Sequence, residues 1–179
     1  MKKINLCFTF LTAIFCIALV FPFSGKAQRR DYLTEAEIEL VREAQEIDLR
    51  VMVLTKAIDR RLAVLKNQTP KEKEEWGELP KGTHTELFLD IEKLLQKAID
   101  DIDEVAERNK DSELFPKAVF KLSDSCQAYL PQFKTFLDTT KDEKERGALL
   151  GSIENCNSVL EASTKVQRVP TKEEKKKKN

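Results

Sequence analysis

The longest uninterrupted helical pattern in the chain covers residues 34–66, where neither glycine nor proline occurs. Apolar residues recur there at steps of three or four, which places them on one face of an α-helix. That face comprises Leu40, Ala44, Ile47, Val51, Leu54, Ile58, Leu62 and Leu65. Such a helix extends for roughly 50 Å, so it can bury this face only against partners that are also long. This requirement predicts long helices packed side by side.

Three further amphipathic segments supply such partners, at residues 85–108, 116–138 and 141–165. Residues 67–84 connect the first two helices and contain the glycines and prolines that end helices. No stretch alternates apolar and polar residues as a half-buried strand does. We therefore predict an all-α fold, an antiparallel four-helix bundle. A helical hairpin packed on one long helix is the alternative.

Two of the predicted helices begin with the spacing of a capping box. Thr34 precedes Glu37, and Thr140 precedes Glu143, by three residues. In a capping box both side chains accept hydrogen bonds from backbone amides that the first helical turn leaves unpaired. The spacing therefore marks these two threonines as helix starts.

Residues 1–27 have the pattern of a signal peptide. Two lysines precede a long apolar run without charge, and Gly25 and Ala27 occupy the −3 and −1 positions of a cleavage site. We expect cleavage after Ala27 and export to the periplasm or the outside of the cell. An uncleaved membrane anchor is the alternative.

The remaining roughly 150 residues are enough for one domain with a core of its own. We assign residues 28–167 to this helical bundle domain and residues 168–179 to a disordered basic tail. Removal of the three lysines of the leader leaves 28 basic and 31 acidic residues. Nucleic-acid binders typically carry an excess of basic residues, which this domain lacks. No transmembrane span is expected after leader cleavage.

The expected mature domain contains two cysteines, Cys126 and Cys156. Both lie on apolar stripes, in the third and fourth helices, and they are equally far from Lys141, near which this hairpin turns. Because exported compartments permit disulfides, we predict a structural disulfide between them. Pro131 weakens the prediction, since an internal proline kinks or breaks a helix. Two buried free thiols or an interchain bridge are the alternatives.

His84 is the only histidine in the chain. A di-iron bundle requires two Glu-x-x-His units, and a zinc site built from this histidine and the two cysteines lacks a fourth ligand. A catalytic pair would require His84 to meet a nucleophile from elsewhere in the fold. We expect a solvated residue at the start of a helix, and we predict no catalytic residue, no cofactor and no metal.

Trp76 is the only tryptophan and lies in the polar connector. A large indole in such a loop favours contact with the bundle, which would pin the connector in place. The alternative is contact with a partner, because tryptophan is enriched among binding hot spots.

Two further patterns have structural explanations. The carboxylates within residues 100–107 lack the spacing of a calcium loop, so they indicate a solvated acidic face. Gly147 and Gly151 lie one helical turn apart and would let a neighbouring helix approach closely.

The run LTEAEIELVREAQEIDLRVMVLTKAIDRRLAVL, followed by EEWGELPKGTHTELFLDIEKLLQKAIDDIDE, resembles a group of uncharacterised secreted bacterial proteins. They share a leader, this first helix and a W-G-x-L-P-x-G loop. The resemblance covers residues 33–105 and implies a bacterial, exported, all-helical protein with no known activity or ligand. It assigns no role to Trp76, Gly77 or Pro80.

These features together predict a non-enzymatic interaction or structural element of the cell envelope. Its partner would be an unknown protein or another envelope component, and self-association stays open if an apolar stripe is wider than its neighbours cover. The alternative is a periplasmic bundle that binds a small ligand or a metal in a pocket near Trp76 and His84.

Overall fold

The computed structural model describes residues 30–70, 73–109 and 112–167. This part of the chain is helical and contains no strand, so the predicted all-α class is confirmed. Its elements are α2 (Glu35–Glu43), α3 (Ile47–Leu65), the short 3-10 helix η1 (Glu74–Trp76), α4 (His84–Arg108), α5 (Leu114–Thr139) and α6 (Glu143–Thr164). The predicted signal peptide and basic tail lie outside the described residues.

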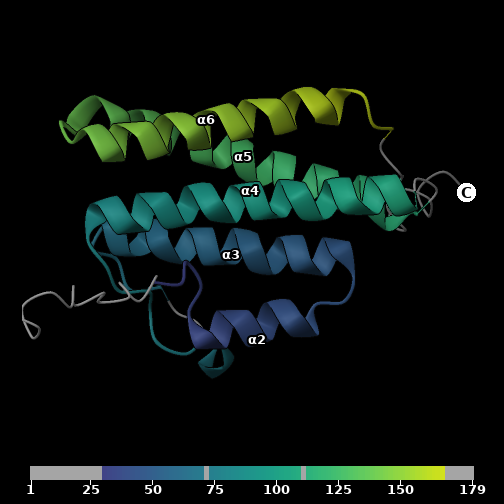
Figure 1. The fold of residues 1–179 in the computed structure, drawn as a ribbon, viewed down its shortest axis with the longest axis horizontal. Helices are drawn as coiled ribbons and strands as arrows, with labels where there is room; N and C mark the ends of the chain where they lie inside the picture. The colour runs from purple at the N-terminus through teal and green to yellow at the C-terminus, as the bar shows by residue number, and fades with distance from the viewer. Residues whose placement is uncertain (1–29, 71–72, 110–111, 168–179) are drawn as a thin grey trace, which may run out of the picture. The chain divides into compact units, whose positions relative to one another are not determined.

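The helices pack side by side as a helical bundle (Figure 1). α3 packs on α4 and on α5, and α6 packs on the same two helices. α2 lies along α3 (Figure 1). Within the described ranges, no helix combines the length and the apolar character needed to cross a membrane.

The predicted apolar stripes form the core between these helices. The side chains of Leu54, Leu94, Leu122 and Leu149, one from each of α3 to α6, are almost fully buried. Burying one such side chain stabilises the fold by about 1.5–3 kcal/mol. A polar contact also links α5 to α3 within the core. The buried hydroxyl of Tyr129 donates to the backbone carbonyl of Thr55 at 2.9 Å. The core therefore follows the three-to-four-residue spacing of the sequence.

The predicted single helix over residues 34–66 is wrong, because the structure divides it into α2 and α3. Ala44 ends α2 with φ −74° and ψ 82°, which lies outside the helical region. The side chain of Arg50 supports the break by donating from Nε to the carbonyl of Ala44 at 3.0 Å. No glycine or proline marks this position.

A contact between distant residues explains the break. Glu37 and Arg60 are 23 positions apart, and a carboxylate oxygen of Glu37 lies 2.7 Å from Nη1 of Arg60. In a continuous helix the same residues would be roughly 35 Å apart along the axis. The chain must therefore fold back on itself between α2 and α3.

The helix starts agree in part with the predicted capping boxes. The box of Thr34 and Glu37 is present at α2. At α6 the predicted box is wrong, because Asp142 caps the helix by accepting from the amides of Lys144 and Glu145. A carboxylate two residues later in the chain thus replaces the hydroxyl of Thr140, which instead donates to the side chain of Glu145.

Pro131 does not end its helix, since α5 continues through it to Thr139. The proline leaves the carbonyl of Gln127 without its usual amide partner. Both residues are exposed, so that carbonyl can be solvated. The proline is tolerated because it lies on the outer face of the bundle.

The two glycines of α6 have different surroundings. A Cβ atom at Gly151 would lie 2.1 Å from Oε1 of Glu92 on α4, whereas a Cβ at Gly147 would have no heavy atom within 4 Å. The pKa of the half-buried Glu92 carboxyl is raised, because the effect of burial exceeds the opposing effect of the Lys93 charge. The predicted close approach therefore occurs at Gly151 and not at Gly147.

Replacing Gly147 by alanine should stabilise the protein by about 0.5–1 kcal/mol, because alanine loses less backbone entropy on folding and meets no neighbour. Gly151→Ala is the matched comparison, since the added methyl group must displace the Glu92 side chain. Urea denaturation of both variants measures the difference. A larger gain from Gly151→Ala than from Gly147→Ala would contradict the packing described here.

Candidate functional site

Trp76 and His84, the two residues proposed from the sequence for ligand or partner contact, make different contacts. Trp76 ends η1 and is half-buried, and its ring lies 5.5 Å from the guanidinium carbon of Arg60. His84 is the exposed first residue of α4, and its ring stands edge-on to Phe88 with centroids 6.4 Å apart. The contact of Trp76 agrees with a pinning role, and its role as a partner anchor stays a prediction.

Beneath Trp76 lies a group of buried charged side chains, which we name the arginine cluster. It consists of Glu37 from α2, Arg60 and Arg61 from α3, and Asp90 from α4, each at most 3% exposed. Two guanidinium groups and two carboxylates balance in formal charge. Buried charges are tolerated only when they are paired and hydrogen-bonded, so the contacts of each member decide what the cluster does.

Arg60 joins three parts of the chain. Its Nη1 donates to Oε1 of Glu37 at 2.7 Å, and its Nη2 donates to the carbonyls of Gly77 at 3.2 Å and Glu78 at 2.7 Å. The guanidinium also lies over the ring of Trp76 within the range of a cation–π contact. Arg60 thus holds α2 and the connector against α3.

Arg61 extends the same arrangement towards α4. Its Nη1 and Nη2 each donate to an oxygen of Glu37 at 2.9 Å, and Nη2 also donates to the carbonyl of Tyr32. Its Nε lies 3.6 Å from Oδ2 of Asp90, which is an ion pair but too long for a hydrogen bond. The side chain therefore links the segment before α2 to α4.

Glu37 receives hydrogen bonds from both arginines and from the helix start. Its Oε2 also accepts from the amide of Thr34 at 2.9 Å, as part of the capping box. Burial alone would raise the pKa of Glu37, but the hydrogen bond and charge of Arg61, with the bonds from Thr34 and Arg60, hold that pKa below its ordinary value of 4.5. The folded state therefore favours the deprotonated, negatively charged form of Glu37.

Gly77 allows the connector to reach this cluster. Its backbone has φ 60° and ψ −158°, a conformation that is essentially restricted to glycine. A Cβ atom there would also lie only 3.0 Å from the Cβ of Ala36 on α2. Glycine is needed at this position both for its backbone conformation and for the close approach to α2.

A hollow of about 420 Å³ lies beside the connector. Thr34, Glu35 and Ala36 line it from the start of α2, and Glu78, Leu79 and Lys81 line it from the connector. Neither Trp76 nor His84 is among its lining residues. Its connector residues Glu78, Leu79 and Lys81 lie between Trp76 and His84 in the sequence, and the binding of a ligand near those two residues stays a prediction.

The two cysteines meet between α5 and α6. Both side chains are fully buried, and the hydrogen bond with Cys156, followed by burial, raises the pKa of the Cys126 thiol. The structure contains free thiols that are not at disulfide distance, and not the disulfide predicted from the sequence. The predicted level and face of the two residues agree with this contact, since α5 passes through Pro131 without a break.

Sequence reasoning missed the arginine cluster. Arg61 continues the apolar spacing of α3, because it lies three residues after Ile58 and four before Leu65. A charged residue within an apolar stripe is a signal that could have identified it as buried and paired. Arg60 carries no such signal, because its burial depends on the connector folding over it.

Glu37→Gln should destabilise the protein by about 3–5 kcal/mol at pH 7, because it leaves two buried arginines with too little negative charge. Since the pKa of Glu37 is lower in the folded state than the ordinary 4.5, its contribution is present above pH 4.5 and is lost as the pH falls through the folded-state pKa. The difference in free energy of unfolding between the variant and the wild type should therefore become smaller in acid. Urea denaturation across this pH range measures it.

Glu39→Gln is the matched control for this substitution. Glu39 lies on the same helix and pairs with Arg42 at 2.7 Å, but both side chains are more than half exposed. Exposed pairs contribute about 0–1 kcal/mol. Equal losses from Glu37→Gln and Glu39→Gln would contradict the structural role assigned to the arginine cluster.

Cys126 and Cys156 should resist alkylation by iodoacetamide in the native protein and react after denaturation without reductant, because both thiols are buried and the pKa of Cys126 is raised. Mass spectrometry counts the added groups. A denatured protein that gains none, and is lighter by two hydrogens, would establish the disulfide in place of the thiols.

Comparison with known proteins adds no further constraint. The chain matches no protein-family model, no curated protein and no solved structure.

Proposed function

We propose that the protein is an exported, non-enzymatic element of the bacterial cell envelope that binds a protein partner through the connector and the start of α2. In this proposal α3 to α6 form an antiparallel four-helix bundle, the leader is removed after Ala27, and the basic tail follows the bundle. One observation carries the proposal. The fully buried Arg60 donates hydrogen bonds to two backbone carbonyls of the connector.

The energetics of the arginine cluster favour a positioning role. Removing two guanidinium groups from water costs several kcal/mol each, and well-packed apolar side chains often give equal or greater stability. A connector that only joined two helices would need no such device. We therefore infer that the cluster fixes the path of the connector from Trp76 to Glu78 on the surface.

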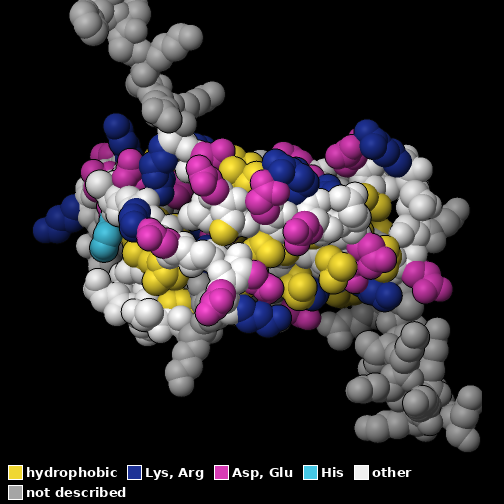
Figure 2. All heavy atoms as spheres, turned by 90° about the horizontal axis from the view of Figure 1, so that it is seen from below, with side chains coloured by type: hydrophobic (Ala, Val, Ile, Leu, Met, Phe, Trp, Pro, Cys, Tyr) yellow, Lys and Arg dark blue, Asp and Glu magenta, His cyan; other side chains and the backbone are white. Residues whose placement is uncertain are grey.

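The surface presented in this way suits recognition of a protein. Glu74, Glu75 and Glu78 are exposed on it together with Lys73 and Lys81. The half-buried Leu79 adds an apolar contact at the hollow. Apolar centres within a charged rim are typical of protein interfaces, and similar patches between charged side chains occur on the face shown in Figure 2.

A second candidate, a small-ligand-binding bundle, is favoured by an apolar pocket between α4, α5 and α6. This pocket lies far along α4 from His84, and its lining residues do not include Trp76. For metal binding there is no comparable support: the described residues contain no group of three histidine, cysteine, aspartate or glutamate side chains placed to hold an ion.

The connector surface can be tested by photo-crosslinking in intact cells that produce the protein with its own leader. A photoreactive amino acid at Leu79 should give a discrete crosslinked species, whereas the same group at Leu150 should not, although Leu150 on α6 is 51% exposed. Adding Glu78→Lys should reduce the crosslinking from Leu79, and the matched surface change Glu154→Lys should leave it unchanged. Equal crosslinking from both positions would rule out the connector as the binding surface.

A further inference from the structure

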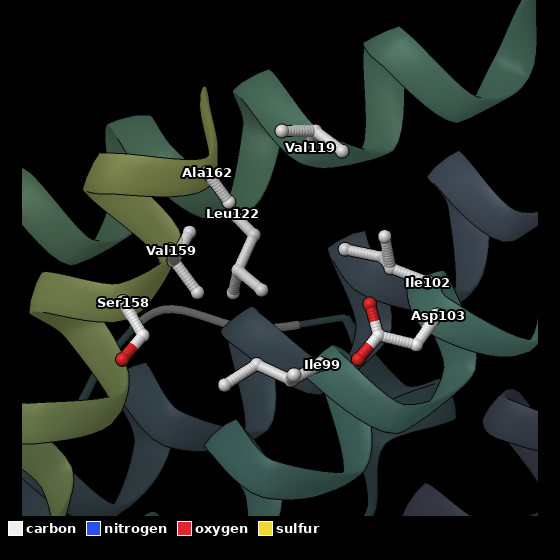
Figure 3. Close-up of a pocket in the computed structure, with 8 residues that line it drawn as sticks. All are labelled: Ile99, Ile102, Asp103, Val119, Leu122, Ser158, Val159 and Ala162. Atoms are coloured by element: carbon white, nitrogen blue, oxygen red, sulfur yellow. The ribbon is translucent and has the colours of Figure 1, made fainter. Parts of the chain in front are cut away.

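The pocket between α4, α5 and α6 has a volume of about 200 Å³ (Figure 3). Six of its eight lining residues are apolar: Ile99 and Ile102 from α4, Val119 and Leu122 from α5, and Val159 and Ala162 from α6. An apolar cavity of about 150 Å³ accommodates benzene. The pocket is therefore large enough for an apolar group slightly larger than a benzene ring.

Two polar side chains also line the pocket, and they are oriented differently. In Figure 3 the carboxylate of Asp103 points towards the apolar side chains, whereas the hydroxyl of Ser158 points away from them. Asp103 forms no ion pair with any residue in the described ranges. Because Asp103 is exposed, it offers one carboxylate at the rim of the pocket, oriented towards the apolar side chains.

The charges around this carboxylate are negative. Partial burial, followed by the charges of Asp100 and Glu107, raises the pKa of Asp103. No described cation is among the groups that act on it. An anionic ligand would be repelled here, whereas a cationic one would be attracted.

We propose that this pocket binds a small organic amine, with its apolar body among the side chains of α4, α5 and α6 and its ammonium group on the carboxylate of Asp103. Burial of the apolar body supplies the attraction, and the ion pair at the mouth selects the positive charge. The inference specifies the ligand-binding candidate and does not depend on the connector surface.

The pocket also differs from the connector hollow in the occupant that fits it. The hollow beside Leu79 is larger and is lined mainly by polar and charged residues, whereas this pocket is smaller and mainly apolar. A volume of about 200 Å³ excludes a helix or a strand of a partner. A compact organic molecule is the occupant that matches both the size and the charge.

The test is a titration of the full-length protein, purified from cells that produce it with its own leader, using three ligands of similar size. 2-Phenylethylamine should cause saturable NMR shifts of the Ile99, Ile102 and Val159 methyl groups. 2-Phenylethanol should bind about fivefold more weakly, since a partly exposed ion pair contributes up to about that factor. 3-Phenylpropanoate should bind more weakly than the alcohol.

Asp103→Asn should reduce the affinity for 2-phenylethylamine to that for 2-phenylethanol. Asp138→Asn, the same change at an exposed site near the other end of α5, should leave the affinity unchanged. Ala162→Leu should abolish binding of both ligands by filling the pocket, and its exposed position favours retention of the fold, which circular dichroism checks.

Three results would overturn the proposal. They are equal affinities of the wild type for amine and alcohol, an unchanged affinity of Asp103→Asn for the amine, and the absence of saturable shifts at the pocket methyl groups. The crosslinking from Leu79 is measured independently, so failure of either proposal is distinguishable from failure of the other.

Discussion

The ion pairs of Glu37 with Arg60 and Arg61 are the interaction on which the N-terminal half of the structure depends. They connect residues 23 and 24 positions apart in sequence, so α2 must turn back along α3. The same arginines hold the carbonyls of Tyr32, Gly77 and Glu78. One buried carboxylate therefore determines the end of α2, its position on α3 and the path of the connector.

This arrangement favours one conformation more than it adds net stability. The attraction between buried charges is offset by the loss of hydration, whereas removing one partner leaves an uncompensated charge. Each alternative path of the connector would leave Arg60 without its two backbone acceptors. A buried guanidinium that finds its acceptors in only one arrangement disfavours the others.

The sequence predicted the parts of the fold that depend on local periodicity. The stripes of α3 to α6 are buried as expected, and the starts and ends of α4 and α5 lie within about two residues of the predicted ones. The break after Ala44 was not predictable in this way, because it is caused by a contact with residues in the next helix. The level at which Cys126 meets Cys156 followed from counting along two helices, but the state of the sulfur atoms did not.

The apolar pocket between α4, α5 and α6 depends on the sizes of the side chains that line it. The side chains that α6 contributes to the pocket are all small, namely Ser158, Val159 and Ala162. Protein interiors are close-packed and hold few voids larger than a water molecule.

Near the other end of α4, Phe88 stacks edge-on with Phe136 at 5.2 Å, and these large rings fill the space between α4 and α5. The pocket lies where the small side chains of Val159 and Ala162 on α6 face residues of α4 and α5. No single stripe reveals this space, since each reads as uniformly apolar. The pocket is formed by three helices together, and the carboxylate of Asp103 on α4 points towards it.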